Sequence, residues 1–522
     1  MKFTYCQKCS ILIKDYEEKG EFMNKQLAIK EYNDYIKVNS MYRYAVASIS
    51  FDDATGAPKK AFKERNEVIT YFQMELFKRS TSNEYRKIIN NLKFYYEDLS
   101  ERYQRIVYLA DKELKKSLKV PQKVMYDYQL ASANANYYWE LAKIKNDYSI
   151  YKPYLKDVIT KQIEVGKCMK EYNKSVYETF LDMYEEDVTE RELDVFFAKL
   201  KERIVPLLKK IMESNVEIRD DFLYRKMTKN KQMKMGTLLV KKLGYDLSTG
   251  MIRETEHPFT NDISSNDVRI TTHIHINNFA SNLFSMAHEG GHGIYGQNID
   301  KRFDNSILKD GASMAFHESQ SRFYENIVSR SEAFSKYFFP YIKKIACGTL
   351  DDVSWEEYYK AINKVSPSLI RTEADELTYC LHIMIRYEIE KMLINNQVDY
   401  DSLNTLWNQK YKEYLGVDVE NDAEGILQDI HWTSGVGYFF SYALGNAYSA
   451  QIYNAMKKEL DVESLLEQGE TKPILAWLKK NIYRHGMLYK PKQLLKMVTG
   501  ETLNVDYYCN YLEEKFSKIY NL

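Results

Sequence analysis

The feature that most constrains this fold is helical periodicity that runs almost without interruption. Apolar residues recur at three- and four-residue spacing among charged ones, for example through residues 159–213. The 522 residues include only nine prolines, so few positions lose the helical hydrogen bond that proline removes. We therefore expect an all-α protein, mainly helical with minor short β-strands. The expected local exceptions include a loop at residues 229–235 and a short edge strand in the alternating stretch 268–276.

Charge and hydropathy exclude several classes of partner. Lys+Arg and Asp+Glu both number 74, so no basic surface is expected to bind nucleic acid. No run approaches the roughly 18 apolar residues that cross a bilayer, and the first residues lack a signal-peptide pattern. We expect a cytoplasmic protein that does not insert into membranes.

The six cysteines are scattered along the chain, as expected for reduced thiols. Cys6 and Cys9 have the spacing of a zinc or redox pair. No second pair follows to complete four ligands. The role of this pair therefore stays open.

Histidines concentrate in one part of the chain. Eight of the nine lie between His257 and His431, so metal or proton chemistry is expected there. Within this part, His288 and His292 enclose Glu289 in an HExxH sequence. Helical residues four apart share a face, so both imidazoles can reach one Zn²⁺ while Glu289 takes a proton from water.

Glycines at 290, 291 and 293 weaken this helix, because each costs about 0.5–1 kcal/mol relative to alanine. Two explanations suit them: close approach of a neighbouring helix or a ligand, or a helix that ends there. Close approach fits a helix buried beneath an active-site groove.

A second amphipathic segment places Glu318 26 residues after His292. Two histidines and one glutamate form a catalytic zinc set that leaves one position open for water. His317 is a competing third ligand, although neighbours on a helix point in different directions. Without the HExxH sequence, Glu318 would be read as a surface partner of Arg322 at i+4.

Six motifs follow one another in the second half of the chain. They are His257-Pro258-Phe259, Asp267-Val268-Arg269-Ile270-Thr271, His288-Glu289-Gly290-Gly291-His292, His317-Glu318-Ser319-Gln320, Ile370-Arg371-Thr372-Glu373-Ala374-Asp375 and Gly425-Ile426-Leu427-Gln428-Asp429-Ile430-His431-Trp432. With these motifs the chain resembles the carboxypeptidase Taq family of metallocarboxypeptidases. The resemblance is strong over residues 250–450 and general in the helical first half.

The resemblance implies a two-lobed helical fold with a deep groove and one divalent metal, Zn²⁺ with Co²⁺ possible, per chain. It implies a homodimer that removes single residues from peptide C-termini. The expected organisation is one domain over 1–522, with an N-terminal helical lobe at 1–250, a metal-site core at 251–450 and C-terminal helices at 451–522.

Four residues are expected at the substrate. A guanidinium fork suits a peptide's terminal carboxylate, so Arg371 is the first candidate and Arg269 the second. The family comparison adds His257 and Tyr442 as donors to the developing oxyanion. Tyr438 rivals Tyr442, because the stretch after Trp432 is one residue shorter than usual and has Phe440 in place of a common proline.

Residues expected to orient the metal ligands are Asp375, Gln428, Asp429 and His431. Two other functions remain open at this stage. One is a helical zinc oligopeptidase that cleaves internal bonds, and the other is a catalytically silent helical peptide-binding protein.

Overall fold

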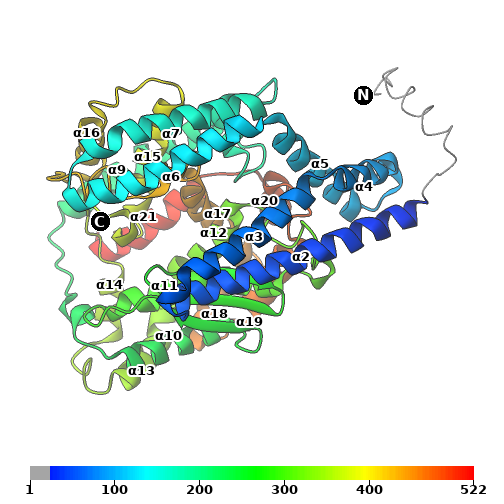
Figure 1. Ribbon diagram of the computed structural model, residues 1–522. Coiled ribbons are helices and arrows are strands. Elements are labelled where there is room, and N and C mark those ends of the chain that lie inside the picture. Colours follow the sequence, from blue (N-terminus) through cyan, green and yellow to red (C-terminus); the bar gives the residue numbers. More distant parts are fainter. Residues whose placement is uncertain (1–23) are drawn as a thin grey trace, which may run out of the picture. The chain divides into compact units, whose positions relative to one another are not determined.

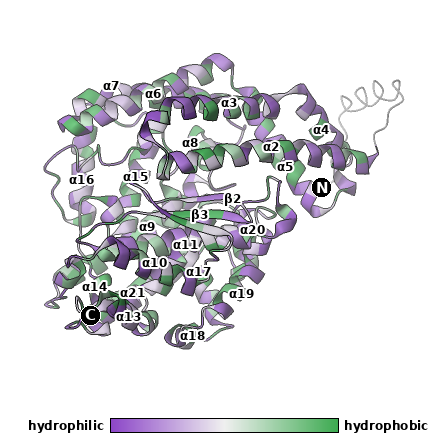
Figure 2. Cartoon of the chain, turned by 60° about the horizontal axis from the view of Figure 1, so that its bottom comes forward, coloured by the Kyte–Doolittle hydropathy of each residue, from purple (hydrophilic) through white to green (hydrophobic). Residues whose placement is uncertain are grey.

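A computed structural model describes residues 24–522, and the Cys6/Cys9 pair lies outside them. The described chain is mainly helical with one small sheet, which confirms the expected fold class (Figure 1). Hydrophilic and hydrophobic residues alternate along the long helices (Figure 2), and none of the described helices is long and apolar enough to span a membrane. The two-lobed form and the deep groove stay predictions.

The contacts divide the chain into two compact units. The first comprises the described residues up to Asp53, Ala57–Leu118 and Asn305–Leu308. The second comprises Ala54–Gly56, Lys119–Asp304 and Lys309–Leu522. The functional residues predicted above all belong to the second unit. The expected boundaries at 250 and 450 stay a prediction.

The first unit is built from amphipathic helices. Ser82 caps one of them, because its side chain accepts a hydrogen bond from the N–H of Tyr85 at 3.0 Å. Ile89, Leu92 and Ile106 are fully buried on the apolar faces. The helices are α2 (Lys25–Thr55), α3 (Phe62–Thr81), α4 (Asn83–Phe94) and α5 (Glu101–Lys119), with 3-10 turns η1 (Lys59–Ala61) and η2 (Tyr96–Asp98).

The second unit begins with α-helices and then forms its sheet. Its elements up to the sheet are α6 (Gln122–Lys145), α7 (Tyr148–Met169), α8 (Val176–Leu181), α9 (Glu190–Met212), η3 (Asp221–Tyr224) and α10 (Lys229–Leu243). The loop expected at 229–235 is wrong, because α10 starts there with Thr228 as its N-cap. Tertiary burial of Gln232 and Met235 on α10 outweighs the weak local pattern.

The sheet has three strands, β1 (Gly250–Glu254), β2 (Thr260–Ser264) and β3 (Asp267–Thr272), in the order β1-β3-β2. β3 pairs in parallel with β1 and antiparallel with β2. The strand expected at 268–276 is thus shorter and central, and its prediction as an edge strand is wrong. The alternating pattern of β3 reflects the burial of Val268 and Ile270. The partner strands β1 and β2 have no such pattern.

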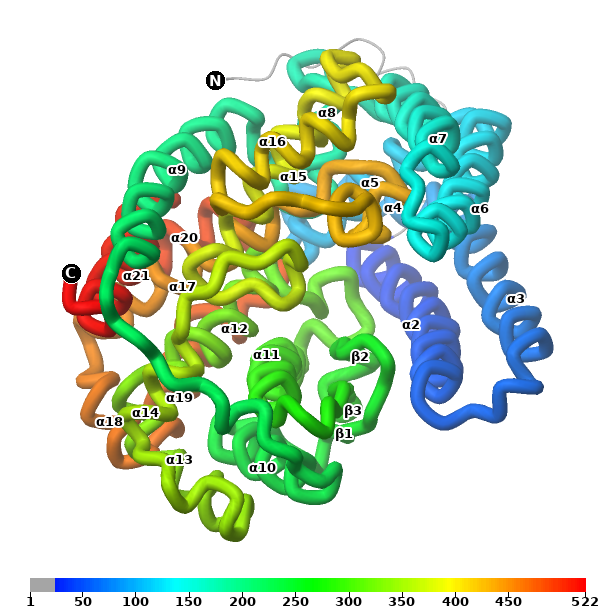
Figure 3. The backbone as a smooth tube through the Cα atoms, turned by 90° about the vertical axis from the view of Figure 1, so that its left-hand side faces the viewer, coloured from blue at the N-terminus to red at the C-terminus, as the bar shows by residue number. Residues whose placement is uncertain are grey.

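The remaining elements follow the sheet, and α11 packs against β2 and β3 (Figure 3). They are α11 (Phe279–Asn298), η4 (Lys301–Phe303), α12 (Met314–Arg322), the π-helix η5 (Phe323–Ser329), α13 (Glu332–Ala346), α14 (Trp355–Ile362), η6 (Arg371–Glu373), α15 (Tyr379–Ile394), α16 (Leu403–Leu415), η7 (His431–Ser434), α17 (Phe440–Lys457), α18 (Val462–Gln468), α19 (Lys472–Asn481), η8 (Tyr483–His485), α20 (Pro491–Thr499) and α21 (Asp506–Tyr520). Helix α12 packs between α11 and α17.

Candidate metal centre

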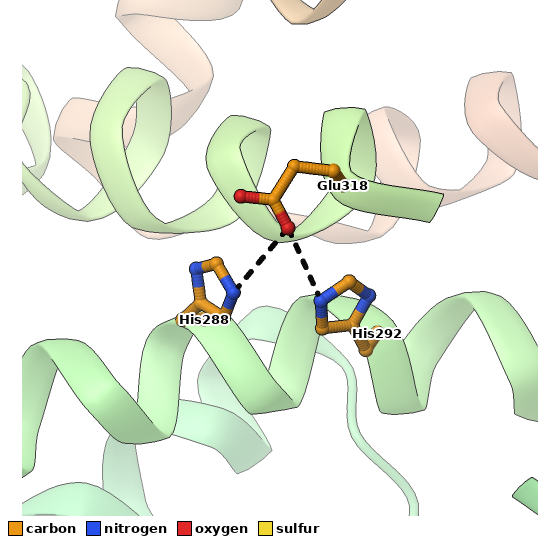
Figure 4. Close-up of side chains that lie close together, drawn as sticks. All are labelled: His288, His292 and Glu318. Carbon is orange, nitrogen blue, oxygen red and sulfur yellow. Dashed lines mark ion pairs between the residues drawn. The ribbon is translucent and has the colours of Figure 1, made fainter. Parts of the chain in front are cut away.

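Helix α11 presents both histidines of the HExxH sequence on one face. The helix starts at Asn278, whose side chain accepts a hydrogen bond from the N–H of Ser281 at 3.1 Å. One turn separates His288 from His292, so both rings project from α11 toward α12 (Figure 4). The structure thus places the two imidazoles as the sequence predicted.

Helix α12 supplies the third side chain. Glu318 Oε2 lies 3.6 Å from His288 Nε2 and 3.6 Å from His292 Nε2 (Figure 4). The ligand atoms of the three residues all lie within 4.8 Å of one another. Zn–N distances of about 2.0–2.1 Å in a tetrahedral site put neighbouring donors about 3.4 Å apart. Two nitrogens and one oxygen at this separation fit one first-row divalent cation.

Two glycines allow the helices to come this close. A Cβ added at Gly291 would lie 2.7 Å from the Cα of Ser321 on α12. A Cβ added at Gly445 of α17 would lie 2.5 Å from Cγ of Glu318. Both separations are shorter than carbon contacts allow. The glycines in HExxH therefore serve close helix packing, one of the two explanations that the sequence left open.

The outer nitrogen of each histidine has a different partner. His288 Nδ1 lies 2.9 Å from Glu325 Oε2 on η5. His292 Nδ1 lies 2.7 Å from His317 Nδ1, and burial lowers the pKa of His317 to about 4. His317 therefore contacts the outside of His292, while Glu318 faces the inner nitrogens of both histidines.

Glu318 is buried beside Arg322. The Arg322 Nε donates to Glu318 Oε1 at 2.7 Å, and Ser321 Oγ donates to Glu318 Oε2 at 3.2 Å. Burial favours the neutral acid, but Arg322 and His288 hold the pKa of Glu318 well below its usual range. The carboxylate is therefore ionised and ready to bind a cation.

Glu289 occupies a different environment on the same helix. Its side chain is buried, and the Thr260 hydroxyl on β2 donates to its Oε2 at 2.6 Å. The same hydroxyl lies 3.0 Å from the main-chain oxygen of Glu289. Burial raises the pKa of Glu289. A carboxyl with a raised pKa next to the ligand set is suited to accept and return a proton.

Arg371 lies in a buried ion pair. Its Nε and Nη2 contact Asp429 Oδ1 at 3.0 and 2.8 Å, and the other oxygen of Asp429 accepts from Arg386 at 2.6 Å. Gln428 Oε1 accepts from the Arg371 N–H at 3.0 Å. Asp429 and Gln428 thus orient Arg371 and contact none of the three metal-site side chains in the described hydrogen bonds.

Tyr379 connects Arg371 with the metal-site residues. Arg371 Nη1 lies 3.4 Å from the Tyr379 hydroxyl, and the Arg322 guanidinium lies 4.2 Å from the centre of the Tyr379 ring. Because Arg322 also contacts Glu318, side-chain contacts connect Arg371 with Glu318 through Tyr379 and Arg322.

The two candidate tyrosines lie together near Arg371. The rings of Tyr438 and Tyr442 are 5.2 Å apart, and the Arg371 guanidinium lies 5.3 Å from the Tyr442 ring. His431 stacks beside Tyr438 at 5.9 Å. Both tyrosines therefore remain candidates for a substrate contact.

Arg269, His257 and Asp375 lie elsewhere on the framework. Arg269 forms a two-bond ion pair with Asp267 on β3, at 2.7 and 2.6 Å. His257 is exposed between β1 and β2. Asp375 accepts hydrogen bonds from Leu377 and Thr378, both at 3.0 Å, and so fixes the turn before α15. Substrate roles for Arg269 and His257 stay predictions.

Four site residues were not singled out by the sequence reasoning: Thr260, Arg322 in a buried role, Glu325 and Tyr379. Glu325 follows Glu318 by seven positions, which is a helical repeat and a usable signal. Thr260 directly follows the His257-Pro258-Phe259 motif. The i+4 spacing of Glu318 and Arg322 indicated their contact but not its burial. For Tyr379 the sequence offers no signal, because its role depends on tertiary burial.

Comparison with known proteins agrees with this geometry. The profile of the family "Carboxypeptidase Taq (M32) metallopeptidase" matches residues 31–516. Carboxypeptidase 1 of Bacillus subtilis is 41% identical over 498 residues, which cover 94% of this chain and 99% of that protein. Thermostable carboxypeptidase 1 of Thermus thermophilus is 36% identical over 77% of this chain and 80% of its own.

Solved structures show the same similarity. The M32 carboxypeptidase from Deinococcus radiodurans superposes with a TM-score of 0.92 at 30% identity, covering 95% of this chain and 100% of that one. The match extends over both units. From the family match, these relatives and the His-His-Glu metal site, we conclude that this chain is a metallocarboxypeptidase, a hydrolase of peptides, and belongs to the carboxypeptidase Taq (M32) family.

Proposed function

We propose that this metallocarboxypeptidase works with one Zn²⁺ per chain, held by His288, His292 and Glu318, and that Co²⁺ can replace it. The observation that carries the proposal is the 3.6 Å separation of both Nε2 atoms from one Glu318 oxygen. Two imidazoles and a carboxylate suit Zn²⁺ and accept other first-row ions. When bound, such a cation polarises a peptide carbonyl and lowers the pKa of a coordinated water.

Glu289 is the proposed general base. Its carboxyl lies on the helix turn that carries both histidines, and the Thr260 hydroxyl holds one of its oxygens at 2.6 Å. Glu289 takes the proton of the attacking water and delivers it to the departing amine. Its raised pKa favours the first of these transfers, because a carboxylate with a higher pKa is the stronger base.

Arg371 is the proposed receptor for the free C-terminal carboxylate. It presents a planar fork, is already oriented by Asp429 and Gln428, and connects to the metal site through Tyr379. Tyr442, or its neighbour Tyr438, and His257 are proposed donors to the developing oxyanion. Arg269 is the second candidate for the carboxylate, although Asp267 engages its guanidinium in this structure.

The assembly and the compartment are proposed on weaker grounds. The family resemblance supports a homodimer, which light scattering on the purified protein tests. The described cysteines Cys168, Cys347, Cys380 and Cys509 are free thiols, which suits a reducing cytoplasm.

The proposed site is tested with one peptide made in two forms, a free acid and a C-terminal amide. Mass spectrometry of the products should show a ladder of single-residue losses from the free acid and little cleavage of the amide. Chelator treatment should abolish the ladder, and Zn²⁺ or Co²⁺ should restore it. Equal cleavage of both forms would contradict recognition of the terminal carboxylate.

Arg371→Gln then tests the carboxylate receptor. Loss of a charge-assisted hydrogen bond should lower kcat/KM for the free acid by about 10- to 100-fold and remove the preference over the amide. Arg386→Gln is the matched control, because Arg386 contacts the other oxygen of Asp429. It should keep the preference for the free acid. If Arg386→Gln abolishes that preference equally, Asp429 and not the fork of Arg371 is the determinant.

A further inference from the structure

We infer that Glu325 is a positioning residue that fixes His288 for metal ligation, and that His292 is fixed differently, by the imidazole of His317. The inference rests on the proposed ligand role of His288 and goes beyond it. It predicts that the two metal-binding imidazoles respond unequally to loss of their outer partners. Neither Glu325 nor this inequality was expected from the sequence.

The backbone brings Glu325 to the outer side of His288. Glu318 lies on α12, and Glu325 lies seven positions later on η5, a π-helix over Phe323–Ser329. In an uninterrupted α-helix that spacing would carry Glu325 about 10 Å along the axis on nearly the same face. The wider π-helical turns, which often occur at functional sites, change its direction. As a result Glu318 faces Nε2 of His288 and Glu325 faces Nδ1.

Two arginines hold the Glu325 carboxylate in place. Arg322 Nη1 lies 3.1 Å from Oε2, and Arg330 Nη2 lies 3.3 Å from Oε1. Arg330 is in turn anchored by the main-chain oxygen of Ile362 at 2.6 Å. A buried carboxylate with both oxygens engaged has little freedom to turn away from His288.

The hydrogen bond also selects the tautomer of His288. An ionised carboxylate only accepts, so His288 Nδ1 must carry the proton and Nε2 keeps its lone pair. That lone pair is the one directed at the ligand set. An anionic partner also makes the imidazole a stronger ligand.

His292 has no carboxylate at its outer nitrogen in the described contacts. Its partner there is another imidazole, with His317 Nδ1 at 2.7 Å. The other nitrogen of His317 lies 3.8 Å from Asp310 Oδ1. An imidazole orients the ring of His292 but adds no negative charge, so we expect the larger contribution to metal affinity from Glu325.

The test measures metal affinity of the folded, metal-free protein by competition for Zn²⁺ with a chelating dye. Glu325→Gln keeps the shape and an acceptor but removes the charge, and should weaken Zn²⁺ binding by about 10- to 100-fold. The absorption spectrum of the Co²⁺ protein should change as well, because it reports ligand geometry. Neither readout depends on peptidase activity.

Glu376→Gln is the matched control. Glu376 is equally buried, at 9% exposure, and accepts from Lys515 at 2.6 Å and Tyr511 at 2.8 Å. Tyr511 also lies 3.4 Å from the main-chain oxygen of Asn326 on η5. The control thus removes the same charge beside the same segment without touching an imidazole. Its Zn²⁺ affinity should stay within about threefold of wild type, a change much smaller than loss of an outer partner produces.

Glu325→Asp separates position from charge and serves if Glu325→Gln does not fold. It keeps the charge between Arg322 and Arg330 but withdraws the oxygens by one C–C bond, about 1.5 Å. We expect weaker Zn²⁺ binding with little loss of thermal stability. The inference fails if Glu325→Asp binds Zn²⁺ like wild type, or if Glu376→Gln weakens binding as much as the Glu325 variants. If wild type itself binds no stoichiometric Zn²⁺, the proposed metal site fails instead.

Discussion

Buried carboxyl groups in two regions of the second unit behave in opposite ways. At the metal centre, Glu318 and Glu325 have lowered pKa values, and that of Glu325 falls to about 2. Away from the centre, burial raises the pKa of Glu185 and of Glu390 to about 7. All four residues are at most 9% exposed, so burial alone does not explain the difference.

The partners explain it. Glu318 and Glu325 share the Arg322 guanidinium. Glu185 instead accepts from the Tyr448 hydroxyl at 2.8 Å, and Glu390 from the Trp432 indole at 3.1 Å and the Tyr177 hydroxyl at 3.2 Å. Neutral donors do not offset the desolvation of a charge, whereas an adjacent guanidinium does. Among these four glutamates, the buried carboxylate therefore stays ionised where a guanidinium adjoins it.

Glu289 lies in the metal centre. Like Glu185 and Glu390, however, its carboxyl has an uncharged hydrogen-bond donor as its partner. Only a hydroxyl, that of Thr260, contacts its carboxylate in the described hydrogen bonds, and its pKa is raised. A ligand must stay ionised, whereas a base must gain and lose a proton. The lowered pKa of Glu318 therefore suits a metal ligand, and the raised pKa of Glu289 suits a general base.

The largest expected effect is that of Glu289→Gln on turnover. Removal of the general base should lower kcat by about 10²–10⁴-fold, while bound metal, measured by elemental analysis, stays stoichiometric. Glu185→Gln makes the same change away from the centre and should leave kcat near wild type. Loss of metal from Glu289→Gln would contradict the distinction between ligand and base, because Glu289 would then be a metal ligand like Glu318.

Arg322→Gln should have the next largest effect, this time on stability. It leaves two buried carboxylates without their shared cation, which costs about 3–5 kcal/mol. With an unfolding entropy of about 2.1 cal/mol/K per residue, the Tm of the metal-free protein should fall by about 3–5 °C. Metal loading should reduce this fall, because the bound cation restores positive charge beside Glu318.

Differential scanning fluorimetry with and without chelator checks this prediction. Arg219→Gln is the control, because Arg219 pairs with Asp352 at the surface at 2.7 Å. Exposed pairs contribute little, so its Tm should stay close to wild type. An equally small change for Arg322→Gln would mean that Arg322 does not set the charge balance of the centre.

Sequence reasoning reached the metal centre because its signals are local. The spacing of His288 and His292 on one helix face needs no tertiary information, and the amphipathic segment that follows it indicated Glu318 as the third ligand. The helical class followed in the same way from period and proline content. The same reasoning missed α10 (Lys229–Leu243), whose helical state depends on burial of Gln232 and Met235 against the rest of the unit.

The residues that tune the centre were beyond this reasoning. Arg322 was read as the surface partner of a lone Glu318, whereas it lies buried against Glu318, Glu325 and Tyr379. Thr260 lies on β2, 29 positions before Glu289. The periodicity of apolar residues in a sequence does not show which distant segments pack together. A π-helix such as η5 has no reliable sequence signature. The sequence therefore did not indicate that the side chain of Glu325 points toward His288.

Glu185→Gln tests the raised pKa of Glu185 through the pH dependence of thermal stability. The folded-state pKa of about 7 lies above the ordinary value of 4.5, so the folded protein binds the Glu185 proton more tightly than the unfolded chain does. Wild type therefore loses stability as pH rises from about 4.5 to about 7, by up to ~3 kcal/mol from this group. Glutamine carries no charge at any pH, so the variant does not show this loss. Between pH 5 and pH 8 the Tm of the variant should therefore rise by about 3 °C relative to the Tm of wild type. Parallel Tm curves for the two proteins would place the Glu185 pKa in its ordinary range.

The smallest expected effect concerns the one hydroxyl that holds the base. Thr260→Val keeps the shape of the side chain on β2 but removes the donor to Glu289 Oε2, a hydrogen bond to a charged group worth about 1.5–3 kcal/mol. Part of that is recovered when water replaces the hydroxyl, so kcat should fall by about 3- to 30-fold with KM and Zn²⁺ affinity little changed. Thr260→Ser restores the hydroxyl and should restore kcat. If Thr260→Ser is as impaired as Thr260→Val, the methyl packing of β2 matters and not the hydrogen bond. If neither variant is impaired, the Thr260 hydroxyl is not needed to hold Glu289 for proton transfer.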